Sequence, residues 1–295
     1  MKDSTAYQYR QVITKYIIPY IGDVRLAKLN ASHIHAMQAG LAAKGLKPNT
    51  VRYARAVLSG ALRHAERLDL VARNVVRLVD APRKSHPMTD DALTLVEARK
   101  LLAAIRGDRL EALVGVALAV GLRRGEALAL RWVDLNLEAK TLTVPGTLKR
   151  RPGRGLYVDR PKTGGSAATI PLPEASIAAL VRHRRRQGEE RLAAGPLWRD
   201  EGFVFTTPVG SPIDGSNALK LFYRMCEDAA VPRRRFHALR HSAATLMWEQ
   251  GVPLDVISAT LRHSGLAITK DIYVAFRPDV MRSGADAMDR ALGGS

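Results

Sequence analysis

The chain has 295 residues, of which 46% are apolar, so it is long enough for one large or two ordinary domains, and global disorder is excluded. Its 46 Lys and Arg against 28 Asp and Glu give a net charge of +18, which favours a polyanionic partner, with nucleic acid ahead of a membrane surface. The single cysteine excludes internal disulfides and cysteine-rich zinc sites. No apolar run approaches a membrane span of about 20 residues, and no signal peptide is evident, so we expect a cytoplasmic protein.

Residues 1–84 are predicted to form a small all-α domain. Apolar residues recur at helical spacing over 9–17, and this first helix is expected to close at 19–22. Two further helices are expected at about 30–44 and 49–68, separated by a turn that contains Gly and Pro.

The third of these helices carries basic side chains with a single acid, Glu66, among them. A solvated helix face is the simpler explanation, but the shared sign of charge favours a face that follows DNA phosphates. The predicted DNA-binding residues on this helix are Arg52, Arg55, Arg63 and Arg67.

A proline-containing linker is expected at 85–92, followed by a second domain over 93–295 that mixes helices with a small sheet. The chain as a whole is therefore predicted to be mainly α with a small sheet, an α+β fold. Helices are expected near 94–105, 109–121, 125–131, 174–187, 217–229, 237–250 and 254–259, and strands near 141–144, 155–158 and 168–171.

Two segments of the second domain carry side chains suited to phosphate chemistry. In Gly-Leu-Arg-Arg-Gly-Glu, residues 121–126, two arginines follow an apolar helix, where an interaction with the helix dipole is an equally good explanation. In His-Ala-Leu-Arg-His, residues 237–241, His237 and Arg240 share one helix face. That face can offer one phosphate both a proton-switchable donor and a permanent cation.

A zinc peptidase helix is the main alternative for the second segment, because His237 and His241 are four residues apart. The position of the general-base Glu is occupied by Ala238, and no acidic third ligand lies nearby. The zinc interpretation is therefore disfavoured, and His241 alone is expected to be structural.

A third segment contains His263 and, ten residues later, Tyr273. Alone, such a tyrosine is more often a core residue with a hydrogen-bonded hydroxyl. Together with Gly-Leu-Arg-x-Gly-Glu, Pro-Lys-Thr and His-x-Leu-Arg-His in this order, it makes the chain resemble the tyrosine recombinase (phage integrase) family over nearly its whole length.

The resemblance implies an all-α core-binding domain and a mostly α catalytic domain with a small antiparallel sheet, forming a clamp on duplex DNA. It also implies site-specific cutting and rejoining of DNA through a 3′-phosphotyrosyl intermediate. In that pattern Tyr273 would attack phosphorus, while Arg123 and Arg240 would clamp the scissile phosphate and stabilise the transition state. His237 and His263 would hydrogen-bond the phosphate and assist proton transfer.

Two further residues receive roles from the resemblance. Lys162 would protonate the leaving 5′-oxygen from a hairpin tip, and Glu126 would orient the site. The covalent link keeps the phosphodiester bond energy, so we expect no ATP, no metal and no other cofactor.

The implied partners are duplex DNA attachment sites, a homotetramer that exchanges strands through a Holliday junction, and accessory directionality or bending proteins. Residues 278–291 have apolar positions at helical spacing and are expected to dock on a neighbouring subunit, the alternative being packing on their own domain. A nucleoid-associated location in a bacterium is expected, with no membrane partner. A separate arm-binding domain is expected to be absent or removed.

The chain departs from the family pattern at four places. Arg262 stands where the family usually has Gly, which tolerates φ > 0, and Arg262 is also a predicted DNA-binding residue. Ala168 stands where an Arg is frequent, Val120 stands where a Thr is common, and residues 274–276 lack a frequent His.

Two other functions fit parts of the sequence. A type IB topoisomerase shares the chemistry but acts as a monomer without a specific site. A DNA-binding regulator without activity is the alternative from another class, and the filling of all six catalytic positions argues against it.

Overall fold

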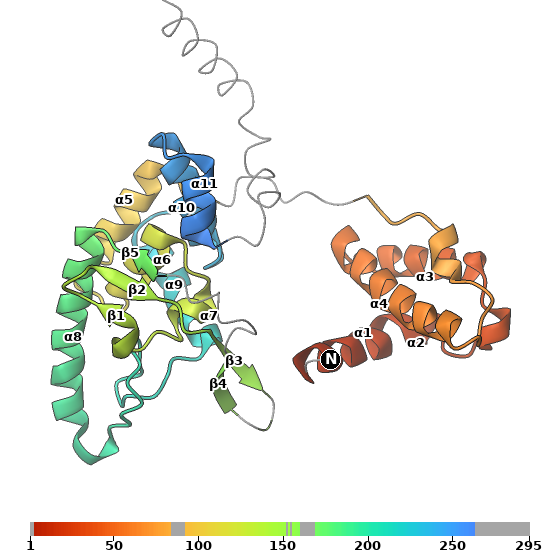
Figure 1. The fold of residues 1–295 in the computed structure, drawn as a ribbon, viewed down its shortest axis with the longest axis horizontal. Helices are drawn as coiled ribbons and strands as arrows, with labels where there is room; N and C mark the ends of the chain where they lie inside the picture. Colours follow the sequence, from red (N-terminus) through yellow and green to blue (C-terminus); the bar gives the residue numbers. More distant parts are fainter. Residues whose placement is uncertain (1–2, 84–91, 152, 154, 160–168, 263–295) are drawn as a thin grey trace, which may run out of the picture. The chain divides into compact units, whose positions relative to one another are not determined.

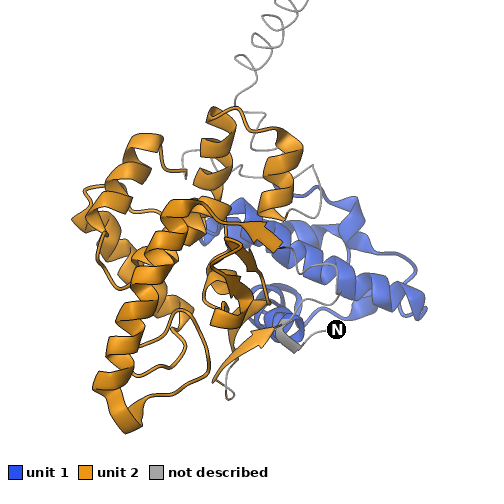
Figure 2. Cartoon of the chain, turned by 60° about the vertical axis from the view of Figure 1, so that its left-hand side comes forward, with its two compact units in different colours: residues 1–87 blue, residues 88–295 orange. Residues whose placement is uncertain are grey.

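The computed structural model describes residues 3–83, 92–151, 153, 155–159 and 169–262. The chain divides into two compact units, residues 1–87 and 88–295 (Figure 2). Each unit has a hydrophobic core of its own. None of the helices in the described ranges is long and apolar enough to cross a membrane.

The first unit is built from helices. Its first helical stretch comprises α1 (Asp3–Val12), a π-helical turn η1 (Ile13–Ile17) and α2 (Ile18–Ile21). A short η2 (Leu26–Lys28) leads to α3 (Ala31–Ala43), and α4 (Pro48–Arg67) is followed by η3 (Val75–Leu78). These bounds lie close to those predicted from hydrophobic spacing.

One face of α4 supplies much of the core of this unit. Val51, Ala54, Leu58 and Leu62, spaced three and four residues apart, are buried in the cluster that also contains Met37 of α3. The opposite face of α4 remains at the surface, and several of its arginines lie there.

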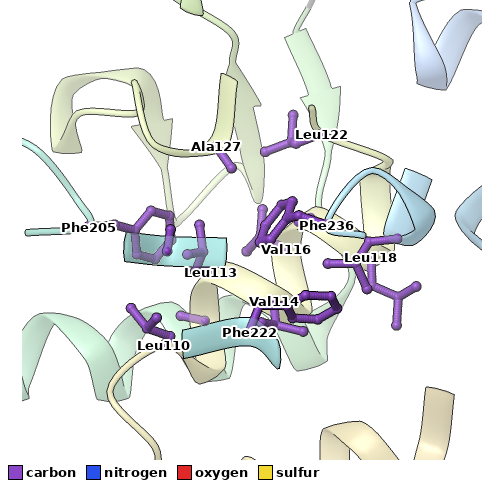
Figure 3. Packing of buried hydrophobic residues seen from close by; sticks show 14 of the residues in the cluster. Leu110, Leu113, Val114, Val116, Leu118, Leu122, Ala127, Phe205, Phe222 and Phe236 are labelled. Carbon is purple, nitrogen blue, oxygen red and sulfur yellow. The ribbon is translucent and has the colours of Figure 1, made fainter. Parts of the chain in front are cut away.

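The second unit surrounds one buried helix, α6 (Glu111–Val120), which is apolar on all sides. It packs against α8 (Glu174–Ala194) and α10 (Ala238–Glu249) (Figure 1). The rings of Phe222 and Phe236 meet edge to face beside it, with centroids 5.3 Å apart (Figure 3).

The remaining helices of the second unit cover this core. Most follow the predicted ranges, although α8 continues past the predicted end at residue 187 as far as Ala194. The helices that cover the core, besides α8 and α10, are α5 (Leu95–Ala104), α7 (Arg124–Ala127), η5 (Trp132–Asp134), η7 (Gly195–Leu197), α9 (Gly215–Asp228) and α11 (Leu254–Leu261).

The strands form two antiparallel sheets rather than the one that was predicted. The first has the order β1 (Leu135–Asn136), β2 (Thr141–Thr143), β5 (Thr169–Pro171). The second is a hairpin of β3 (Thr147–Arg151) and β4 (Gly155–Asp159). The sequence pattern missed β3 because four of its five residues are polar or basic, and only Leu148 is buried. The predicted strand at 155–158 therefore pairs outside the first sheet.

The end of α6 determines where the first arginine motif emerges. Gly121 follows α6 in the left-handed region, with φ of 63° and ψ of 38°. A β-carbon there would lie 2.1 Å from Leu261 Cδ2 and 3.5 Å from Arg240 Cγ. Glycine therefore allows α6 to end against α10 and α11, and the chain turns from buried Leu122 to exposed Arg123.

We expect Gly121→Ala to lower the free energy of unfolding of the second unit by about 2–4 kcal/mol, because left-handed strain adds to overpacking. Urea denaturation followed by circular dichroism measures the change. Gly115→Ala is a matched control in the same helix, since nothing lies within 4 Å of its β-carbon. In that control the free energy of unfolding should rise by roughly 0.5–1 kcal/mol, because alanine has a higher helix propensity than glycine. Equal stability of Gly121→Ala and wild type would contradict the analysis.

Candidate active site

Arg123 and Glu126 form the exposed side of the candidate site. Arg123 is the N-cap of α7, and its backbone N–H donates to Glu126 Oε2 at 3.0 Å. Its Nη1 donates to Glu126 Oε1 at 2.8 Å. The Arg123 side chain is 46% exposed and that of Glu126 only 9%. Burial opposes ionisation of this carboxyl, but the hydrogen bonds from Arg123 and the charge of Arg262 outweigh it and lower the pKa of Glu126.

Arg240 forms the buried side of the site. It is 3% exposed, and its Nη1 donates to the carbonyl of Gly121 at 2.6 Å. Its Nη2 donates to the carbonyl of Leu261. Burial, followed by repulsion from Arg123 and Arg262, lowers the pKa of Arg240 to about 9, so this guanidinium remains cationic at neutral pH.

His237 is the N-cap of α10 and lies at the surface. Its ring meets that of His241 edge to face, with centroids 4.9 Å apart. Partial burial, followed by repulsion from His241, Arg240 and Arg123, lowers the pKa of His237 to about 4. The imidazole is therefore neutral at pH 7 in the free protein and surrounded by positive charge.

A hollow of about 570 Å³ opens beside His237. Residues of the β3–β4 hairpin, of α7 and of α9 line it, and this lining combines apolar side chains such as Leu128 and Phe236 with several basic ones. The basic residues that line it are Arg124, Lys149, Arg150 and Arg235, and none of the three arginines was proposed from the sequence as a site residue. The run of three arginines at 233–235, which ends two residues before His237, is the signal that could have found Arg235.

Arg262 completes the charged cluster. It is the C-cap of α11 and has φ of 56° and ψ of 48°, so the position does require the left-handed conformation that the usual glycine would provide. Its Nη2 donates to Glu126 Oε2 at 2.8 Å, across 136 positions of sequence. The structure thus brings Arg123, Glu126, Arg240 and Arg262 together with His237 at the ends of α6, α10 and α11.

Three of the predicted catalytic residues, Lys162, His263 and Tyr273, lie outside the described residues. The same holds for Ala168 and for the segment 278–291. Within the described ranges, no group of three or more His, Cys, Asp or Glu could hold a metal ion.

The arginines of α4 divide into two pairs. Arg52 Nη1 donates to the carbonyl of Pro82 at 2.7 Å, and Arg55 Nη2 donates to the carbonyls of Val76 and Val79 at 2.9 and 2.8 Å. These two side chains tie η3 and the segment after it to α4. Arg63 and Arg67 are exposed.

Comparison with known proteins identifies relatives along the whole chain. A family model described as "Phage integrase family" matches residues 70–279, and one described as "Phage integrase, N-terminal SAM-like domain" matches residues 1–42. "Tyrosine recombinase XerC-like" of Caldanaerobacter subterraneus is 42% identical over 62% of this chain. An "Integrase" of Streptomyces ambofaciens is 33% identical over 93% of this chain. The alignments span 49% and 72% of those two relatives.

Solved structures share the fold. The Tn1549 transposon integrase in complex with transposon right end DNA has a TM-score of 0.79 at 23% identity, covering 92% of this chain and 90% of that chain. A lambda integrase tetramer bound to a Holliday junction has a TM-score of 0.68 at 18% identity, covering 92% of this chain and 72% of that chain. The predicted fold class, mainly α with small antiparallel sheets, is confirmed. Because one family model matches well over half of the chain and the Streptomyces relative aligns with nearly all of it, this chain belongs to the phage integrase family of tyrosine recombinases.

Proposed function

We propose that this chain is a site-specific DNA recombinase that cleaves and rejoins duplex DNA through a 3′-phosphotyrosyl intermediate. Membership of the phage integrase family supports the activity. The observation that carries the assignment of the site is the charge cluster, in which the guanidinium groups of Arg123, Arg240 and Arg262 surround the single carboxylate of Glu126. Such an excess of positive charge fits one phosphate.

The reaction suits these side chains. The Tyr273 hydroxyl would pass its proton to a base, for which His237 and His263 are the candidates, and attack phosphorus. A phosphodiester with one negative charge then becomes a pentavalent species with two. Hydrogen-bond donors that are already in position stabilise this dianion more than they stabilise the ground state. Arg123 and Arg240 would donate to the nonbridging oxygens, with His237 and His263 beside them. The 5′-oxygen then leaves as a hydroxyl. Rejoining is the reverse reaction, in which a 5′-hydroxyl attacks the phosphotyrosine and releases Tyr273.

Lys162 is the proposed acid for the leaving 5′-oxygen. Lys149, a described lysine that lines the hollow, donates to Asp159 Oδ2 at 2.7 Å across the β3–β4 hairpin. That ion pair holds the Lys149 ammonium on the hairpin, so Lys149 is the poorer candidate for reaching the leaving oxygen.

For contacts with the DNA backbone, we assign Arg63 and Arg67 of α4, which are exposed. Arg52 and Arg55 are assigned to holding the first unit together, since both donate to backbone carbonyls of that unit. Phosphate contacts of this kind position the protein but read no sequence.

The proposed assembly is a homotetramer on two attachment sites, with residues 278–291 docking on a neighbouring subunit and accessory directionality or bending proteins setting the direction. The lambda integrase tetramer on a Holliday junction supports this by analogy of fold. The proposed location is the bacterial cytoplasm, on the nucleoid. A requirement for a specific site and for several subunits separates this function from a type IB topoisomerase.

Tyr273→Phe should abolish cleavage and leave DNA affinity within about twofold, because only the attacking hydroxyl is lost. The substrate is a nicked duplex built from the ends of the genetic element that carries the gene, which traps the covalent adduct for gel analysis and peptide mapping. Tyr223→Phe is the matched control and should cleave like wild type. An adduct mapped to any other tyrosine would refute the assignment.

Lys162→Ala should slow cleavage of the ordinary substrate and be largely rescued by a substrate with a 5′-bridging sulfur, because a thiolate leaves without a proton. Arg123→Ala should not be rescued, since the charge that it stabilises develops whatever the leaving atom. Both rates come from single-turnover cleavage. If Lys162→Ala cleaves both substrates like wild type, the acid lies elsewhere.

Binding of DNA should raise the pKa of His237 from about 4, because a phosphate anion favours the imidazolium form. Binding then takes up a proton, so affinity should rise as pH falls through the bound-state pKa and level off below the free-state value. Histidine-selective NMR with and without DNA measures both values. His237→Gln should remove this part of the pH dependence, and a lower pKa in the complex would contradict the role.

A further inference from the structure

Arg262 occupies an unfavourable position. Four described residues other than glycine have positive φ, namely Asp69, Lys140, Ala230 and Arg262, and the first three are exposed. The Arg262 side chain is only 11% exposed. A residue with a β-carbon is strained in this region of φ, and turns elsewhere assign it to small or polar residues at the surface.

The charge environment adds to this cost. Burial of the Arg262 guanidinium lowers its pKa, and the nearby charge of Arg123 acts in the same direction, while Glu126 opposes both. Arg262 thus combines backbone strain, the cost of removing its guanidinium from water and repulsion from the charge of Arg123. Unfavourable features that persist in a fold are most often found where they serve a function.

The hydrogen bonds of Glu126 show what Arg262 does. Glu126 Oε2 accepts from Arg262 Nη2 at 2.8 Å and from the backbone N–H of Arg123 at 3.0 Å. Only Oε1 remains for the Arg123 guanidinium, which donates to it through Nη1. An arginine and a carboxylate otherwise tend to close a pair of parallel hydrogen bonds. Arg262 and the backbone N–H of Arg123 together occupy Oε2 and leave no place there for a second bond from the Arg123 guanidinium, and the Arg123 side chain stays 46% exposed.

We infer that Arg262 is a positioning residue for the phosphate site, which holds Glu126 so that the guanidinium of Arg123 stays turned toward the scissile phosphate instead of folding onto the carboxylate. This inference rests on the proposed recombinase function. Arg262 also anchors Glu126 to the end of α11, the point in the sequence that directly precedes His263.

The first test follows single-turnover cleavage of the nicked duplex at saturating protein. Arg262→Met keeps the strain and most of the bulk, and Arg262→Gly removes both. Each should lower the cleavage rate constant about tenfold while changing DNA affinity less than about twofold, because the ground-state contacts persist. Arg262→Lys should recover part of the rate. Ala230→Gly, which relieves left-handed strain at an exposed site, is the matched control and should cleave like wild type.

A double-mutant cycle with Glu126→Gln identifies the route. If Arg262 acts through Glu126, Arg262→Met should slow the Glu126→Gln protein by less than about threefold, so the two effects do not multiply. Effects that multiply would overturn the inference and indicate direct contact of Arg262 with the phosphate. A lower melting temperature with an unchanged rate constant in the folded fraction would overturn it in favour of a purely structural helix cap.

A readout without DNA keeps the inference separate from the proposed function. Arg123 should react readily with phenylglyoxal in wild-type protein, because its side chain is half exposed. In Arg262→Met it should close onto Glu126 and react several-fold more slowly, as measured by peptide mapping, with Arg185 as an exposed internal reference. Unchanged labelling of Arg123 would refute the inference even if cleavage is confirmed. Wild-type protein that never forms a covalent adduct would refute the proposed function, whatever the labelling.

Discussion

The site depends on one buried guanidinium, that of Arg240, which is held between the carbonyls of Gly121 and Leu261. The carbonyls at the ends of helices lack partners, and a buried cation lacks water, so each group satisfies the other. This single side chain joins the ends of α6, α10 and α11. Because Gly121 lies 119 positions before Arg240, the bond also places the turn that carries Arg123 beside the helix that carries His237.

The electrostatics of this junction favour function over stability. Three guanidinium groups lie near the Glu126 carboxylate. Burial, followed by repulsion from the positive charge of neighbouring basic residues, lowers the pKa values of Arg240, Arg262 and His237. A bound phosphate relieves that repulsion, and a pentavalent dianion relieves it further. Under the proposed function the free protein would therefore hold the charge pattern of the transition state in advance, and binding of a phosphate there would stabilise the fold by linkage.

Local features of this structure could be predicted from the sequence, and long-range pairings could not. The spacing of apolar residues predicted α4 and α6 because a helix is set by neighbours three and four positions away. Strand β3 was missed because four of its five residues are polar or basic, so the pairing of β3 with the predicted strand at 155–158 was missed as well. In the site, Arg123 and Arg240 followed from the resemblance, whereas the pairing of Glu126 with Arg262 joins segments 136 positions apart and has no local signature.

The arginines also show why net charge and DNA contact are different quantities. Arg52 and Arg55 count toward the charge of +18 and act at long range as any cation does, yet Arg52 Nη1 and Arg55 Nη2 donate to carbonyls of their own unit. Steering of DNA toward the protein depends on the summed charge, but counterion release depends on the phosphates that are actually contacted. The salt dependence of binding should therefore be set by exposed groups such as Arg63 and Arg67. The number of phosphate contacts derived from it should be smaller than the net charge of the sequence.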